Sequence, residues 1–233
     1  MTSTDLTIKF LATGVGRDRI NKLAQYIAQF LEWYFKRQGV TKDTVDKISK
    51  LKTHLGIARK LMNVGRQMEM LRGAEKAWGV KDPIVRYTTV AKLTGMALWL
   101  TCDNASWANT VGIIKLSNPK DVTDKAMQAW FVALVSSLIG GVYKYRTNAV
   151  RLDMALKARR AGTAKGVKDE AVEKEIGDLE KERFGIVLGL LQDTLDISVP
   201  VSALNWYPLE SGMVGLAGIA SAAIGIYTHS LTL

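Results

Sequence analysis

Few residues of this chain have the types and spacing that catalysis or metal binding requires. The chain has one cysteine, Cys102, and two histidines, His54 and His229, which are far apart in the sequence. Zinc sites take closely spaced cysteine, histidine or carboxylate ligands, and neither histidine has such partners at ligand spacing. Cys102 lies in an apolar run without a neighbouring histidine, which favours an inert thiol over a nucleophile. We therefore expect no catalytic residue, no metal site, no cofactor and no enzyme activity.

The glycine pair near the N-terminus has only the outline of a phosphate-binding loop. The segment Gly14-Val15-Gly16-Arg17-Asp18 is not followed by Gly-Lys-Ser/Thr, and no strand is predicted before it. A phosphate-binding loop needs both features, because the strand and the following helix hold its backbone N–H groups around the phosphates. Nucleotide binding is therefore disfavoured.

The most informative pattern lies in residues 57–78 and suits a membrane surface. Apolar side chains recur at helical spacing on one narrow face: Ile57, Leu61, Val64, Met68 and Leu71, with Trp78 at its edge. Five cations lie opposite or beside this face: Arg59, Lys60, Arg66, Arg72 and Lys76. A core-packing helix is the competing interpretation, but a thin apolar face with a cationic surplus is typical of interfacial helices. We predict that the apolar residues insert into a membrane and that the cations bind anionic phospholipid.

Composition limits the classes of partner. The net charge is +10 and 48% of the residues are hydrophobic, which suits nucleic acid, an anionic membrane or an acidic protein. The basic runs lack interleaved aromatic residues, and a soluble nucleic-acid binder would leave the long uncharged stretches unexplained. We expect no nucleic-acid partner. The N-terminus lacks the apolar region of a signal peptide.

The elements that would position the amphipathic segment are all predicted to be helices. Apolar residues at helical spacing predict a long helix over residues 17–37, which Gly39 ends. A second helix starts near residues 41–44. Because its apolar stripe is out of phase with that of residues 57–78, we predict a bend or break near Gly56. Asp82-Pro83 opens a further helix.

Several apolar stretches follow, and the last is the best candidate for a membrane span. Residues 129–143 are uncharged but shorter than the roughly 20 residues that a spanning helix needs. Residues 211–227 are uncharged and rich in small side chains, and Gly215, Gly218, Ala222 and Gly225 would let a second helix approach closely. The number and orientation of the spanning helices stay open.

These patterns predict an all-α membrane protein with N-terminal amphipathic helices and short, glycine-rich membrane helices. We expect four regions. Residues 1–80 form a membrane-surface region, residues 81–150 a first membrane-embedded region, residues 151–183 a charged loop or helix, and residues 184–233 a C-terminal membrane-embedded region. Residues 162–166 are expected to form a flexible joint between a basic and an acidic block.

Three motifs stand in order along the first half of the chain. Residues 13–20 resemble a "G-R-D-K" helix, with Arg19 in place of the lysine; residues 58–65 resemble "R-K-x-x-R-x-G", with Asn63 in place of the second arginine. Residues 98–107 resemble "Y-x-x-x-D-N-x-x-W". Together they resemble the peroxin-eleven family of peroxisomal membrane proteins (the peroxisomal membrane protein 11 family).

The resemblance implies a peroxisomal membrane protein, with both termini in the cytosol, that elongates the membrane and promotes peroxisome division and proliferation. It also implies self-association into a homo-oligomer and work with a dynamin-type fission GTPase and its membrane adaptor. An alternative is a channel for small metabolites or ions. In that case Asp103, Asp193 and Asp196 are candidate lining residues, with helix capping or solvent exposure as the competing interpretation.

Overall fold

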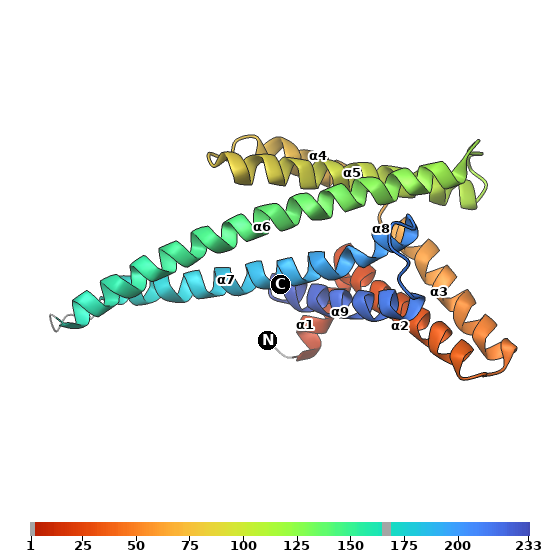
Figure 1. Ribbon diagram of the computed structural model, residues 1–233, viewed down its shortest axis with the longest axis horizontal. Coiled ribbons are helices and arrows are strands. Elements are labelled where there is room, and N and C mark those ends of the chain that lie inside the picture. Colours follow the sequence, from red (N-terminus) through yellow and green to blue (C-terminus); the bar gives the residue numbers. More distant parts are fainter. Residues whose placement is uncertain (1–2, 165–168) are drawn as a thin grey trace.

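The computed structural model describes residues 3–164 and 169–233, and these residues form nine helices and no strand (Figure 1). The helices are α1 (Ser3–Ala12), α2 (Gly14–Arg37), α3 (Lys42–Met62), α4 (Arg66–Ala77), α5 (Pro83–Thr110), α6 (Pro119–Ala164), α7 (Glu170–Asp196), α8 (Ser198–Ala203) and α9 (Ser211–Ser230). The prediction of an all-α protein is confirmed.

α2 and α3 form an antiparallel hairpin (Figure 1). Thr13 caps α2, because its Oγ1 accepts a hydrogen bond from the backbone N–H of Gly16 at 2.9 Å. Gly39 has φ +68°, a left-handed conformation that glycine adopts without steric cost. The predicted stop of the first long helix at Gly39 is confirmed.

The prediction of a break near Gly56 is wrong. α3 runs without interruption through Gly56 to Met62, and the chain breaks instead between Asn63 and Gly65. Gly65 has φ +91°, which ends one helix and redirects the chain into α4. The apolar phase therefore shifts within one uninterrupted helix. The amphipathic segment 57–78 is therefore divided between the end of α3 and α4.

α5, α6 and α7 form the longest part of the molecule. Asp82 caps α5 through hydrogen bonds from the N–H groups of Ile84 and Val85, at 2.9 and 3.0 Å, as Asp82-Pro83 predicted. α6 has 46 residues, which corresponds to about 69 Å at 1.5 Å per residue, more than twice the roughly 30 Å hydrocarbon core of a bilayer. α6 and α7 run antiparallel and converge at the far end of the molecule (Figure 1).

The expected regional boundaries coincide only partly with helix ends. The boundary at residue 80 falls between α4 and α5, whereas those at residues 150 and 183 fall inside α6 and α7. Helix propensity continues across these changes from apolar to charged residues. Gly162 lies within α6, and residues 165 and 166 of the expected joint lie outside the described residues.

Three segments of the described chain are long and apolar enough to cross a membrane: Pro119–Thr163, Glu170–Ala203 and Ser211–Ser230. They contain α6, α7 with α8, and α9. The predicted candidate at the C-terminus is among them. α5 is not, although the sequence places it in the first membrane-embedded region. Lys92 and Asp103 interrupt its apolar run.

Candidate membrane-binding surface

The apolar residues predicted to insert into a membrane lie largely on the outside of the molecule. Leu61 is 53% exposed, Met68 66% and Leu71 48%. Val64 and Trp78 are exposed as well, whereas Ile57 is half-buried. These six residues, from the end of α3, the break, α4 and its C-cap, are called the apolar row below.

Trp78 and Tyr87 extend the apolar row onto α5. Their rings meet edge to face with centroids 6.0 Å apart, and both side chains are more than half exposed. Aromatic side chains with one wet end are enriched where proteins meet the headgroup region of a membrane. The beginning of α5 therefore belongs to the same surface, which the sequence did not indicate.

Two of the predicted lipid-binding cations are instead bound within the chain. Arg59 donates to Asp18 Oδ1 from Nε and to Gln25 Oε1 from Nη1, both at 2.9 Å. Lys60 Nζ lies 2.8 Å from Asp103 Oδ1. These contacts fix α3 to α2 and to α5. The one-dimensional pattern could not show them, because the carboxylates lie about 40 residues away.

The other three predicted cations differ in their surroundings. Arg66 donates to Asn63 Oδ1 at 2.5 Å and lies 3.8 Å from Asp18. Arg72 and Lys76 are exposed and form no ion pair within residues 3–164 and 169–233. These two cations lie on α4 with Met68 and Leu71, so α4 carries both an apolar and a cationic surface.

The small residues of α9 pack against α2. Positions Gly212, Gly215, Gly218 and Gly225 face Trp33, Phe30, Tyr26 and Arg19 in turn, and Ala222 is fully buried. A Cβ atom at Gly215 would lie 3.0 Å from the backbone nitrogen of Phe30, and one at Gly218 would overlap the ring of Tyr26. Burial raises the pKa of Tyr26 to about 12. The sequence predicted close packing here, but it did not identify the partner helix.

A buried polar cluster joins α2, α7 and α9. Lys22 Nζ donates to Asp196 Oδ1 at 2.8 Å and to Ser221 Oγ at 2.9 Å, and Ser221 donates to Asp196 at 2.5 Å. Burial lowers the pKa of Lys22, against the opposing charge and hydrogen bond of Asp196. The cluster was missed because its members are separated by long stretches of sequence.

The candidate channel-lining aspartates do not line one cavity. Asp193 accepts a hydrogen bond from Ser137 and lies at a cavity of about 760 Å³ between α5, α6 and α7. Asp103 and Asp196 lie at a second cavity of about 270 Å³ and are both ion-paired. Helix capping, the competing interpretation, is not their role either.

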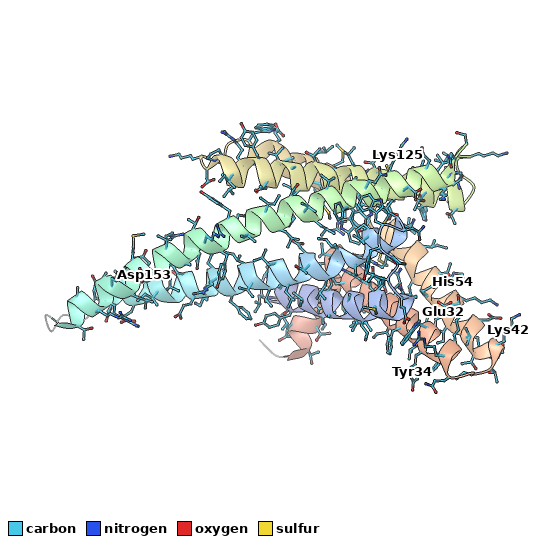
Figure 2. All side chains as sticks on the ribbon, viewed as in Figure 1. Glu32, Tyr34, Lys42, His54, Lys125 and Asp153 are labelled. Carbon is cyan, nitrogen blue, oxygen red and sulfur yellow. The ribbon has the colours of Figure 1, made fainter. Side chains whose placement is uncertain are left out.

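The cysteine and the histidines stay apart in the structure. Cys102 is half-buried on α5, and burial raises the pKa of its thiol. His54 lies on α3 (Figure 2), whereas His229 lies on α9 with its Nε2 3.0 Å from Thr13 Oγ1. Among the residues that the structure describes, no group of three histidine, cysteine or carboxylate side chains could hold a metal ion.

The described residues form nine helices, contain three segments suited to a bilayer and expose an amphipathic surface. These features define an all-helical membrane protein. The chain belongs to the Peroxisomal biogenesis factor 11 (PEX11) family, whose sequence model matches residues 4–230. The resemblance drawn from the three motifs is thereby confirmed, and the match extends it to nearly the whole chain.

Individual relatives carry names that agree with this assignment. The chain is 26% identical to Peroxisomal biogenesis factor 11 of Schizosaccharomyces pombe, over 94% of this chain and 92% of the relative. It is 22% identical to Peroxisomal membrane protein 11B of Homo sapiens, over 96% of each chain. It is 23% identical to Peroxisomal membrane protein PMP30B of Candida boidinii, over 94% of this chain and 91% of the relative. No solved structure matches the chain.

Proposed function

We propose that this protein lies in the peroxisomal membrane and remodels and elongates it, which promotes peroxisome division and proliferation. In this proposal the apolar row enters one leaflet while Arg72 and Lys76 contact anionic headgroups. Side chains that insert between the headgroups of one leaflet expand that leaflet relative to the other. The expanded leaflet becomes the convex face, so insertion from the cytosolic side makes the membrane bulge toward the cytosol.

The exposure of the apolar row is the observation that supports this proposal. Large apolar side chains that stay in water forfeit about 1.5–3 kcal/mol each relative to full burial. Partial burial of Leu61, Met68 and Leu71 among lipids would recover on the order of 1 kcal/mol for each. Each cation near an anionic leaflet adds about 1 kcal/mol. The sum favours reversible insertion of this surface.

In the same proposal Arg59 and Lys60 position the surface and do not bind lipid. Their ion pairs with Asp18 and Asp103 hold α3 against α2 and α5. These ion pairs keep the apolar row on the outside of the molecule. Insertion therefore does not require α3 to detach from α2 and α5. Arg66 is held by Asn63 in a similar manner.

Reconstitution of the full-length protein into anionic vesicles tests the proposal. We expect the wild-type protein to elongate the vesicles into tubules, and Leu61→Glu with Met68→Glu to abolish tubulation while the protein stays in the membrane fraction at alkaline pH. Leu51→Glu is the matched control, because Leu51 is an exposed apolar residue of α3 outside the apolar row. Tubulation by the double variant at the wild-type level would contradict the proposal.

We further propose that the protein self-associates, acts with a dynamin-type fission GTPase and its membrane adaptor, and holds both termini in the cytosol. The family assignment supports these statements. Protease digestion of intact peroxisomes that carry a terminal epitope tag tests the orientation. Loss of both terminal tags without detergent is expected, and protection of either tag would contradict it.

A membrane channel is the second candidate, and one observation favours it. The 760 Å³ cavity between α5, α6 and α7 contains a polar chain in which Lys92 Nζ donates to Ser137 Oγ at 2.8 Å and Ser137 donates to Asp193. If the protein conducts ions in planar bilayers, Asp193→Asn should change the conductance or the ion selectivity. Asp153→Asn, on the exposed surface of α6, is the control (Figure 2).

A further inference from the structure

The cavity of about 270 Å³ lies where α2, α3, α4 and α5 meet α6 and α7. The proposed membrane contact does not use it, because the six residues of the apolar row lie elsewhere. Its lining residues include members of all three sequence motifs: Asp18 and Arg19 from the first, Arg59 from the second, and Asp103 from the third. Motifs separated by about 40 residues of sequence therefore converge on one cavity.

Basic side chains outnumber acidic side chains in its wall. The basic residues are Arg19, Lys22, Arg59, Lys60 and Arg66, and the acidic residues are Asp18, Asp103 and Asp196. Arg59, Lys60 and Lys22 neutralise these carboxylates at 2.8–2.9 Å. Arg66 reaches Asp18 only at 3.8 Å, and Arg19 forms no ion pair in the described part of the chain. Two guanidinium groups are therefore in excess.

Three N–H donors on lining residues have no acceptor. Arg19 Nε, Arg66 Nε and Trp99 Nε1 are shielded from solvent and lack a hydrogen-bond partner among the described residues. Buried donors without a partner destabilise a fold, and most buried donors in native proteins are satisfied. Three such donors around one cavity indicate an acceptor that the chain itself does not supply.

Aromatic side chains form part of the remaining wall. The rings of Trp99 and Trp130 stack with centroids 4.9 Å apart, and Tyr26 is buried on the α2 side. Burial lowers the pKa of Arg19; Asp18 opposes this shift, and the nearby positive charge of Arg66 adds to it. An anion between the two guanidinium groups would relieve both the repulsion and the loss of solvation.

We propose that this cavity binds the phosphate group of an anionic ligand, either a phospholipid headgroup or a small soluble phosphate ester. Arg19 and Arg66 supply charge-assisted hydrogen bonds to the phosphate oxygens, and the indole N–H of Trp99 supplies a neutral one. Bound phosphate would tie α2 and α4 to α5 at the junction with α6 and α7. This site is separate from the apolar row, so the inference does not rest on the proposed remodelling.

Two probes distinguish the sources of the phosphate. The full-length protein in neutral detergent is titrated with inorganic phosphate at constant ionic strength, and separately with phosphatidic acid in the micelles, against diacylglycerol as the lipid without phosphate. Thermal unfolding is followed. We expect a rise of about 5–10 °C at roughly 100 times the dissociation constant. A response to phosphatidic acid alone assigns a lipid headgroup, and a response to inorganic phosphate assigns a soluble ester.

Variants connect the response to the cavity. Arg19→Gln with Arg66→Gln is expected to weaken binding at least about tenfold, because two charge-assisted bonds are lost. Trp99→Phe keeps an aromatic side chain and removes the indole N–H, so it tests the site even if the arginine variant folds poorly. A several-fold loss of affinity is expected. Lys47→Gln with Lys157→Gln removes two exposed cations that lie outside both the cavity and the apolar row, and is the matched control.

Two results would overturn the proposal. One is a wild-type protein that neither probe stabilises, in which case the cluster serves the fold alone. The other is a Trp99→Phe variant that binds the probe with wild-type affinity, if the arginine variant also binds with wild-type affinity or does not fold. The control variant should bind like the wild type; an equal loss there would assign the response to general surface charge.

Discussion

Lys22 and Asp196 are 9% and 8% exposed, and their ion pair connects the N-terminal hairpin to the C-terminal helices. Ser221 of α9 accepts a hydrogen bond from Lys22 and donates one to Asp196, so a third helix contributes to the cluster. Such a pair adds little net stability relative to apolar residues of similar volume. Removal of one member, however, leaves a buried charge without compensation.

The first prediction follows from this asymmetry. Lys22→Met should lower the free energy of unfolding by about 3–5 kcal/mol, and the double substitution Lys22→Met with Asp196→Leu should recover most of that loss. Lys47→Met is the control, because Lys47 pairs with Asp43 on the surface and should matter by less than about 1 kcal/mol. Denaturant unfolding in detergent measures all three. A double variant as unstable as Lys22→Met would contradict the prediction.

Glu32 provides a pH-dependent contact between α2 and α3 (Figure 2). Burial alone would raise its pKa, but the hydrogen bonds from Lys36 at 2.8 Å and Lys52 at 2.5 Å outweigh burial, and the pKa is lowered. A carboxyl group whose pKa is lower in the folded state contributes stability above its unfolded pKa. That stability is lost as the pH falls through the folded value.

The second prediction is therefore a pH profile. Glu32→Gln should be less stable than the wild type above pH 4.5, the ordinary pKa of a glutamate, and the two proteins should converge as the pH falls below it. Denaturant unfolding at several pH values between about 3 and 7 measures the difference. A constant difference across this range would show that Glu32 acts through packing rather than through its charge.

At the scale of helices, some glycines allow close packing of a neighbouring helix and others do not. Gly218 of α9 touches the ring of Tyr26, whereas Gly189 of α7 has no neighbour near its missing Cβ. The third prediction is that Gly218→Ala lowers stability by about 1–3 kcal/mol through overpacking, while Gly189→Ala is neutral or raises stability by up to about 1 kcal/mol. Thermal unfolding in detergent compares them, and equal effects would exclude tight α2–α9 packing.

The break between α3 and α4 gives the fourth prediction. Gly65→Ala should cost about 1–2 kcal/mol, because a residue with Cβ is strained at φ +91°. Gly56→Ala should be neutral or stabilising, because Gly56 is helical and its Cβ would lie 3.4 Å from the side chain of Gln25. A larger loss of stability at position 56 than at position 65 would contradict this prediction and would favour the bend near Gly56 that the sequence suggested.

Local signals in the sequence predicted the ends of helices better than they predicted which side chains form ion pairs. Asp82-Pro83 and Gly39 mark helix boundaries through short-range chemistry, so the sequence predicted them correctly. Gly65 carries the same signal, but the phase of the apolar stripe favoured Gly56. The roles of Arg59 and Lys60 depended on Asp18 and Asp103, which are brought close only by folding, so the charge pattern alone suggested lipid contacts.

At the scale of the whole molecule, the N-terminal amphipathic helices pack on the apolar helices and expose an apolar row. α2 lies along α9, and α4 lies along α5 (Figure 1). The amphipathic surface is therefore part of a folded unit that includes the candidate spans. Insertion of the row would act on the membrane in which the same chain is embedded. Under the proposed insertion, this coupling would distinguish the protein from an isolated interfacial peptide.

Depth measurement at Met68 in reconstituted vesicles tests the central proposal most directly. A spin label is placed at Met68→Cys in a Cys102→Ser background, with Asp46→Cys on the exposed surface of α3 as the control. We predict that the label at position 68 collides with oxygen in the hydrocarbon region and is protected from a water-soluble nickel chelate, and that the label at position 46 shows the opposite. Equal exposure of both labels to the chelate would contradict insertion of the apolar row.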